Sequence, residues 1–239
     1  MLEEQLNQLY EGYGYRKFRM SKFEDYDLYA QNKDFLKKGH IITFTDVDGS
    51  LKALKPDITL SIMKSNGGDS EKVYYNENVC REVGGAFREI LQVGVESVGQ
   101  IDPYAEAEVI ALAAKSLEIL SEDYVLDLSD VSFIRCLLGG MNLSQGDQEQ
   151  ALTLISQKNA PGIQAMADRG ILSAQDAQAI QELMGIYAPL KEGIAQAGRL
   201  ARDNQSWEIL RQLSVTASML EAFGLNGRIR LDFSLVNSM

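Results

Sequence analysis

The sequence is poor in histidine and cysteine, and these shortages exclude several kinds of site. Of its 239 residues, one is histidine and two are cysteine. His40 alone cannot supply a two-histidine metal site or an HExxH zinc motif, and its place before Ile41 predicts a loop or strand edge. Cys80 and Cys136 form no CxxC pair and have no neighbouring histidine. We therefore expect neither a zinc site nor a disulfide framework.

Long apolar runs and basic clusters are missing too. No stretch approaches the roughly 18 uncharged apolar residues of a membrane span, so we expect none. The start of the chain, Met1–Leu6, is acidic and lacks the basic region and apolar core of a secretory signal, which predicts a cytoplasmic protein. The net charge of -11 works against nucleic-acid binding, because phosphate backbones attract basic surfaces.

Phosphate-binding and calcium-binding loops are also absent from the pattern. Neither GxGxxG nor GxxxxGK[ST] occurs in the sequence. The segment Asp46–Ser50 resembles the start of a calcium loop, but Leu51 stands where such a loop needs glycine. A hairpin turn between strands at 41–45 and 51–54 is the better interpretation. We expect no metal and no cofactor.

Apolar periodicity predicts mixed helix and strand in the first half of the chain. Helical spacing indicates helices at 2–11 and 103–120, and a helix that starts at Asp57 with Ile58, Ile62 and Met63 facing inward. Strands are expected at 71–83, 89–98 and 124–128, and the first two should pair around a glycine-containing loop.

The character of the sequence changes after residue 129. Residues 130–223 favour several short helices, with breaks expected near Gly139-Gly140, Pro161-Gly162, Gly170 and Pro189. Alternation after Gly227 predicts a return to strand at 229–236. This order indicates an α+β core formed by 1–129 and 224–239, with 130–223 as an inserted helical lobe.

Polar side chains among apolar neighbours mark the two paired strands as a candidate binding site. Gln92, Gly94 and Glu96 share one face of their strand, and Arg81 on the partner strand could lie near Gln92 or Glu96. An arginine beside an amide and a carboxylate can contact an anionic and an ammonium group. Gly94 would leave room for a ligand to approach the sheet. The same charges could instead form an internal salt-bridge network.

Four blocks of the sequence resemble the histidyl-tRNA synthetase family. Gly12–Glu24 resembles its motif 1, with Met20-Ser21 where the family usually has proline, and Phe44–Thr59 is similar to its F-x-D-x-x-G…L-R-P-D-x-T segment. Val79–Glu96 resembles motif 2, and Arg230–Val236 resembles the strand before the histidine-binding R-G-L-D-Y-Y-T-G loop. The resemblance implies a class II aminoacyl-tRNA synthetase-like fold, a mainly antiparallel sheet flanked by helices with a helical insertion.

The resemblance also implies roles for individual positions. In that family, the residues at the positions that match Asp57, Thr59, Gln92 and Glu96 bind the substrate histidine. The match to Arg81 contacts the ATP α-phosphate, and the match to Arg88 lies in the nucleotide-facing loop.

Departures from the synthetase pattern make another branch the better match. Cys80 replaces the phenylalanine of F-R-x-E, and Lys55 and Lys64 replace arginines. The sequence ends at Met239, before the histidine-binding loop, motif 3 and any anticodon-binding domain, so we do not expect it to aminoacylate tRNA. It is more similar to the synthetase-like regulatory subunit of ATP phosphoribosyltransferase, the first enzyme of histidine biosynthesis.

That second resemblance implies a non-catalytic function. A regulatory subunit would homodimerise within a hetero-oligomer, bind the short-form ATP phosphoribosyltransferase catalytic subunit and make it respond to histidine. A fragment of a true histidyl-tRNA synthetase, and a degenerate synthetase-like domain with another partner, stay open as alternatives. We also expect the strand at 229–236 to form an open sheet edge if the chain ends at Met239.

Overall fold

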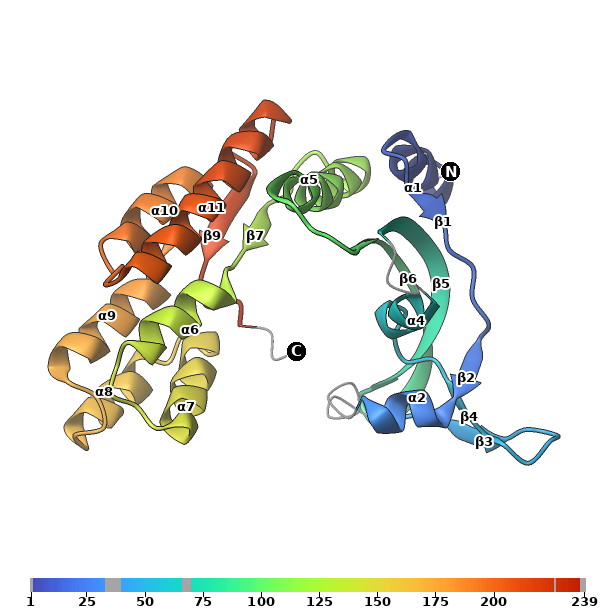
Figure 1. Cartoon of the computed structure of the whole chain (residues 1–239), viewed down its shortest axis with the longest axis horizontal. Helices are drawn as coiled ribbons and strands as arrows, with labels where there is room; N and C mark the ends of the chain where they lie inside the picture. The colour runs from blue at the N-terminus through green and yellow to red at the C-terminus, as the bar shows by residue number, and fades with distance from the viewer. Residues whose placement is uncertain (1, 33–39, 66–69, 226, 237–239) are drawn as a thin grey trace. The chain divides into compact units, whose positions relative to one another are not determined.

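The computed structural model describes residues 2–32, 40–65, 70–225 and 227–236. Contacts divide the chain into two compact units, one up to Ala105 and one from Glu106 (Figure 1). This division by contacts differs from the predicted division into a core and an inserted helical lobe. The core and the lobe stay a prediction.

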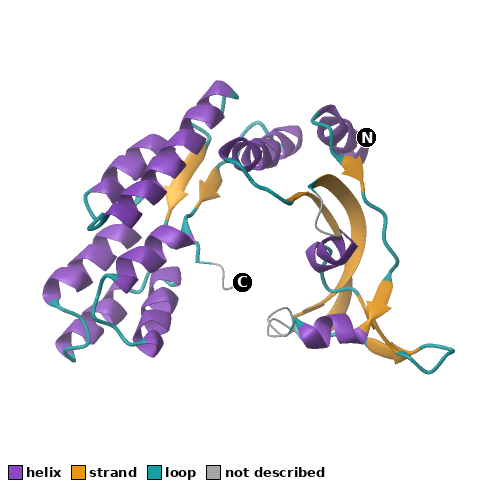
Figure 2. Cartoon of the chain, viewed as in Figure 1, coloured by secondary structure: helices purple, strands orange, loops and turns teal. Residues whose placement is uncertain are grey.

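A long β-hairpin dominates the first unit. Strands β5 (Glu71–Val83) and β6 (Ala86–Val98) pair antiparallel along their whole length, and β1 (Arg16–Lys17), which follows helix α1 (Leu2–Gly12), adds parallel to β5 (Figure 2). Gly84 and Gly85 form the turn with φ of 62° and 79°. Two consecutive positive φ values suit a tight hairpin and favour glycine. The predicted hairpin is confirmed, although β6 begins three residues earlier than expected.

A second, smaller sheet lies in the same unit. Its strand order is β2-β4-β3, with β2 at Phe23–Asp25, β3 at Thr43–Thr45 and β4 at Leu51–Leu54. Strands β3 and β4 pair antiparallel, which confirms the hairpin expected around Asp46–Ser50. Helix α2 (Tyr26–Gln31) follows β2 directly.

Helix α4 (Thr59–Ser65) comes after the second sheet. Ile58 and Ile62 are fully buried beside β5, as expected, but Met63 is 56% exposed. The inward prediction for Met63 is wrong because a helix turns by about 100° per residue, which carries Met63 away from the face of Ile62.

Helices make up most of the second unit. Their side-chain caps explain where several begin: Asp130, Ser144, Asn159, Ser173 and Asp203 each accept a hydrogen bond from a backbone N–H of the first turn. The helices are α5 (Pro103–Leu120), α6 (Val131–Gly139), α7 (Gln145–Ser156), α8 (Ala160–Asp168), α9 (Ala174–Met184), α10 (Leu190–Gly198) and α11 (Asn204–Ala222).

Two helix predictions are confirmed. The helix at 103–120 is confirmed residue for residue as α5. The break expected near Pro161-Gly162 is confirmed: α7 ends at Ser156, Asn159 caps α8, and Pro161 lies in the first turn of α8. Proline is well tolerated there, since the first-turn N–H groups have no partner within the helix.

The last strand lies in the middle of a three-stranded sheet. Strand β9 (Ile229–Asp232) pairs parallel with β7 (Leu126–Leu128) and antiparallel with β8 (Tyr187–Pro189). The expected open edge at this strand is therefore wrong, and the strand ends four residues earlier than predicted. Strand β8 escaped prediction because it is short and ends in Pro189, a residue that is tolerated on an edge strand.

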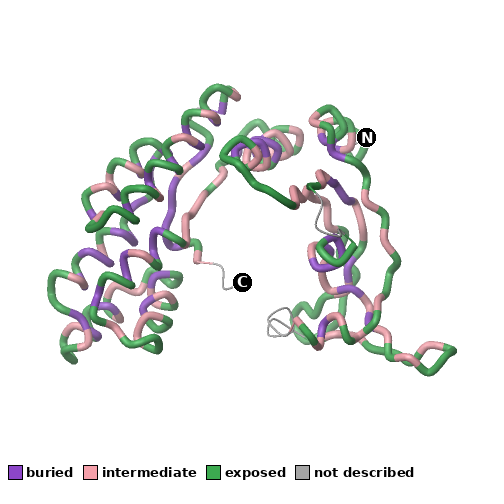
Figure 3. Tube along the Cα trace, viewed as in Figure 1, coloured by how far each residue is buried: buried purple, intermediate pink, exposed green. Residues whose placement is uncertain are grey.

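The core of the second unit forms where its helices pack on this sheet. Leu231 of β9 and the rings of Phe133 and Phe233 are fully buried, and the buried stretches of the helices and of β9 face one another (Figure 3). Helix α10 approaches β9 closely at Gly193, where a Cβ atom would lie 2.8 Å from that of Leu231. Among the described residues, no helix combines the length and the apolar character that crossing a bilayer requires.

Candidate functional site

The candidate site lies on one face of the β5–β6 hairpin, beside the segment that leads into α4. Directly opposed residues of an antiparallel pair place their side chains on the same face. Tyr75 lies opposite Gly94, Val73 opposite Glu96, and Arg81 opposite Arg88. The register therefore brings the predicted residues of both strands to a single face.

Arg81 links the hairpin to the segment before α4. Its Nε donates to the Pro56 carbonyl at 2.7 Å, and its Nη2 donates to Asp57 Oδ2 at 3.0 Å and to Gln92 Oε1 at 3.1 Å. The expected proximity of Arg81 and Gln92 is confirmed. The expected internal charge pairing is present in part: Arg81, whose side chain is 44% exposed, forms an ion pair with Asp57 and hydrogen bonds with Pro56 and Gln92.

Glu96 and Thr59 form a second hydrogen-bonded pair in the site. The Thr59 hydroxyl donates to Glu96 Oε1 at 2.7 Å, and the Thr59 backbone N–H donates to Asp57 Oδ1 at 2.9 Å. Burial raises the pKa of Glu96, and the nearby charge of Asp57 adds to this rise, while hydrogen bonds from Thr59 and Tyr75 oppose it. Two carboxylates close together in a part-buried site favour a cationic group between them.

Tyr75 belongs to the site although the sequence analysis did not single it out. Its hydroxyl accepts a hydrogen bond from Gln92 Nε2 at 3.3 Å, and burial raises its pKa to about 12. A Cβ on Gly94 would lie 2.5 Å from this hydroxyl. The space over Gly94 is therefore filled by the Tyr75 ring, which corrects the expectation that it admits a ligand. The sequence could have indicated this, because Tyr75 and Arg81 are an even number of residues apart on one strand and therefore face the same side.

We expect Gly94→Val to destabilise the first unit by about 1–3 kcal/mol, the usual cost of overpacking a filled site. The buried Tyr75 ring must move, and its hydrogen bond with Gln92 is then lost. Urea denaturation measures the effect. Adding Tyr75→Val should recover part of the loss, because the smaller side chain frees the space. Equal stability of Gly94→Val and the parent would contradict this packing.

Arg88 and His40 lie near the turn end of the hairpin. Arg88 is exposed and faces the same side as Arg81, and its nucleotide-facing role stays a prediction. His40 precedes β3 and pairs with Glu82, which raises the pKa of the imidazole. Its expected position in a loop or at a strand edge is confirmed.

Metal and thiol chemistry find no assembled site in the described part of the chain. No group of three or more His, Cys, Asp or Glu side chains there is placed to hold a metal ion. Cys80 and Cys136 are both free thiols.

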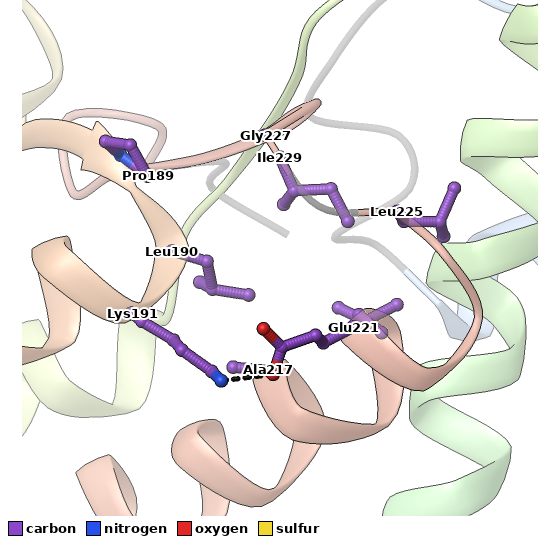
Figure 4. Close-up of a pocket in the computed structure, with 9 residues that line it drawn as sticks. Pro189, Leu190, Lys191, Ala217, Glu221, Leu225, Gly227 and Ile229 are labelled. Atoms are coloured by element: carbon purple, nitrogen blue, oxygen red, sulfur yellow. Dashed lines mark hydrogen bonds and ion pairs between the residues drawn. The ribbon is translucent and has the colours of Figure 1, made fainter.

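The second unit contains a cavity of its own, of about 220 Å³ (Figure 4). Its lining is mainly apolar and includes Leu190, Leu225 and Ile229, while Lys191 and Glu221 form an ion pair beside it. Because the two charges neutralise each other, this cavity offers less polar chemistry than the hairpin face.

Comparison with known proteins shows which family the chain belongs to. The family model described as histidyl-tRNA synthetase matches residues 1–239. The chain belongs to the histidyl-tRNA synthetase family. Among curated members, the chain is 22% identical to an ATP phosphoribosyltransferase regulatory subunit of Ruminiclostridium cellulolyticum and 25% identical to one of Caldanaerobacter subterraneus, both over 100% of this chain. It spans only 59% and 64% of their lengths.

Solved structures of this family share the fold. A Bacillus halodurans protein, titled as an ATP phosphoribosyltransferase regulatory subunit/histidyl-tRNA synthetase, has a TM-score of 0.86 at 22% identity, with 98% of this chain and 63% of that one covered. The histidyl-tRNA synthetase of Nostoc sp. PCC 7120 has a TM-score of 0.82 at 16% identity, with 99% and 57% covered. The predicted class II synthetase-like α+β fold and the predicted resemblance to regulatory subunits are confirmed.

Proposed function

We propose that this chain acts as a regulatory subunit of ATP phosphoribosyltransferase in the cytoplasm. It would bind the short-form catalytic subunit, as a homodimer within a hetero-oligomer, and take part in histidine feedback without doing chemistry itself. The observation that carries the proposal is the match over the whole chain to proteins named as that subunit. A solved structure titled as the ATP phosphoribosyl transferase (HisG:HisZ) complex from Thermotoga maritima, with a TM-score of 0.76 and 17% identity, gives a precedent for such an assembly.

The hairpin face supplies a pocket wall for a histidine-like ligand in this proposal. Glu96 and Asp57 are the acceptors for an ammonium or imidazolium group, and Thr59 holds both carboxylates in place. Gln92 can turn its amide toward the ligand. Arg81 would hold Asp57 and Gln92 in position rather than grip a phosphate, since its side chain already contacts both.

The test is an activity assay of the short catalytic subunit with and without this chain. We expect the chain to co-elute with the catalytic subunit and raise its activity, and we expect histidine to inhibit the mixture more strongly than the catalytic subunit alone. The control is the second unit's exposed ion pair, removed by Lys191→Ala with Glu221→Ala, which should leave both effects intact. Absence of both co-elution and activation would contradict the proposal.

A fragment of a histidyl-tRNA synthetase is the second candidate, and the description of the matching family model favours it. Such a fragment would activate histidine with ATP, and Arg81 and Arg88 would face the nucleotide. Histidine-dependent exchange of pyrophosphate into ATP by the purified chain separates the two functions. Exchange above background would favour the synthetase over the regulatory subunit.

A further inference from the structure

A second cavity lies in the first unit, apart from the residues of the hairpin site, and several charged residues line it. Its volume is about 430 Å³, within the range of small-molecule pockets. Four segments line it: the stretch from Phe18 to Ser21, strand β2, the stretch from Lys52 to Lys55 at β4, and helix α4. Ser61, Lys64 and Ser65 lie three and four residues apart on α4, so they share one face of that helix.

The lining of this cavity carries more positive than negative charge. Its cations are Arg19, Lys52, Lys55 and Lys64, and its carboxylates are Glu24 and Asp25, so four positive and two negative charges leave a net charge of +2. This local excess contrasts with the net charge of -11 for the whole chain. A small cavity lined by one sign of charge attracts ions of the opposite sign.

Three of the four cations have carboxylate partners, and two of these cations share Glu24. Lys55 Nζ lies 2.8 Å from Glu24 Oε1, and Lys52 Nζ lies 2.5 Å from Asp25 Oδ1. Lys64 lies 3.8 Å from Glu24 Oε2, beyond hydrogen-bond distance, and its side chain is 49% exposed. The excess positive charge therefore comes from Lys64 and from the exposed Arg19.

A buried hydroxyl in the same lining lies near a second buried hydroxyl, that of Tyr29. Ser61 is 3% exposed, and neither its Oγ nor the Tyr29 hydroxyl makes a well-formed hydrogen bond within the described residues. A buried hydroxyl left without a hydrogen bond costs free energy, and an acceptor supplied by a ligand would remove this cost. Lys55, 2% exposed, places a second buried polar side chain in the lining.

We propose that this cavity binds a small molecule through an oxyanion, a phosphate or carboxylate group. Lys64 and Arg19 would supply the counter-charge, and the Ser61 hydroxyl would donate to an oxyanion oxygen. The buried Lys55 is paired with Glu24 and would add no net charge to the site. This inference does not depend on the proposed regulatory function, because it concerns binding by this chain alone.

Titration calorimetry of the full chain at low ionic strength tests this site, since salt screens such contacts. The probes are inorganic phosphate and methyl phosphate for the phosphate source, and succinate for the carboxylate source. We expect Lys64→Met and Ser61→Ala each to raise the Kd of the bound probe by about tenfold, the size of one charge-assisted hydrogen bond. The matched control is Lys17→Met, which removes one exposed charge from β1 and should leave the Kd unchanged.

The possible results distinguish a phosphate ligand from a carboxylate ligand, and they also show when the proposed site is wrong. Binding of both phosphate probes but not succinate assigns a phosphate ligand, and the reverse assigns a carboxylate. Binding that Lys64→Met and Ser61→Ala leave unchanged, or no binding of any probe at millimolar concentration, would overturn the proposal. Thermal unfolding followed by circular dichroism shows whether each variant keeps the parent fold. If Lys64→Met does not keep the fold, Lys64→Gln is a second variant that lacks the charge.

Discussion

Glu96→Ala is expected to weaken histidine binding by about a hundredfold. Glu96 is part-buried on the hairpin face, and burial makes its interaction with an ammonium group stronger than a surface contact would be. Removing one partner of a desolvated charge pair costs about 2–5 kcal/mol, and about 1.4 kcal/mol corresponds to tenfold. Titration calorimetry of the full chain with histidine measures the change.

Two further variants define what the Glu96 result means. Glu77→Ala removes a carboxylate from the same face of the hairpin, opposite Gln92, and should leave histidine binding nearly unchanged. Glu96→Gln can still accept the hydrogen bond from Thr59 but lacks the charge, so it should lose most of the binding while keeping the local structure. If Glu96→Ala binds histidine as the parent does, the ligand pocket is not at this hairpin face.

The raised pKa of Glu96 also sets the sign of a pH effect. A carboxyl group whose folded-state pKa lies above its unfolded value binds protons more tightly when folded, so its contribution to stability falls as pH rises between those two values. Glu96→Gln removes this dependence. The variant should therefore gain stability relative to the parent as pH rises from the ordinary carboxyl range through the raised pKa of Glu96.

The largest effect on stability is expected from Phe233→Ala, at about 3–5 kcal/mol in the free energy of unfolding of the second unit. The Phe233 ring is fully buried, and its centroid lies 5.3 Å from that of Phe133. Its removal would leave a cavity between α6 and the end of β9, where the packed backbone can close only in part. Urea denaturation followed by circular dichroism measures the loss.

Leu235 provides the matched control for this prediction. It lies two residues further along the same segment but is 44% exposed, so Leu235→Ala should change the free energy of unfolding by no more than about 0.5 kcal/mol. Equal effects of the two substitutions would show that the segment after β9 is not packed as described.

The parts of the fold that were predicted correctly depend on local signals. The β5–β6 hairpin was predictable because apolar and polar residues alternate on both sides of Gly84-Gly85, and glycine accepts the positive φ that the turn requires. Helix α5 was predictable because an apolar face recurs over eighteen residues without a break. In both cases the residues of the element itself, and those next to it in the sequence, are sufficient to predict its secondary structure.

The errors occur where a partner distant in sequence decides the outcome. Strand β8 has three residues and ends in proline, and it becomes a strand only because β9 supplies the hydrogen-bond ladder. The apolar–polar alternation of β9 did not predict that it lies in the middle of its sheet, because an edge strand and a middle strand can have the same alternation. Met63 is exposed because the rotation of α4 against β5 is set by Ile58 and Ile62.

The sequence by itself indicated a group of residues that lie together: Asp57, Thr59, Arg81, Gln92 and Glu96 are joined in one hydrogen-bonded network with Tyr75. Their role in binding a ligand stays a prediction. Only the tertiary structure decided how they are joined. Arg81 turns to Asp57 and Pro56, Glu96 bonds to Thr59, and Tyr75 fills the space over Gly94. The physical reason is that residue type and strand parity specify which side chains share a face, whereas the packing of α4 against the hairpin selects the partner of each polar group.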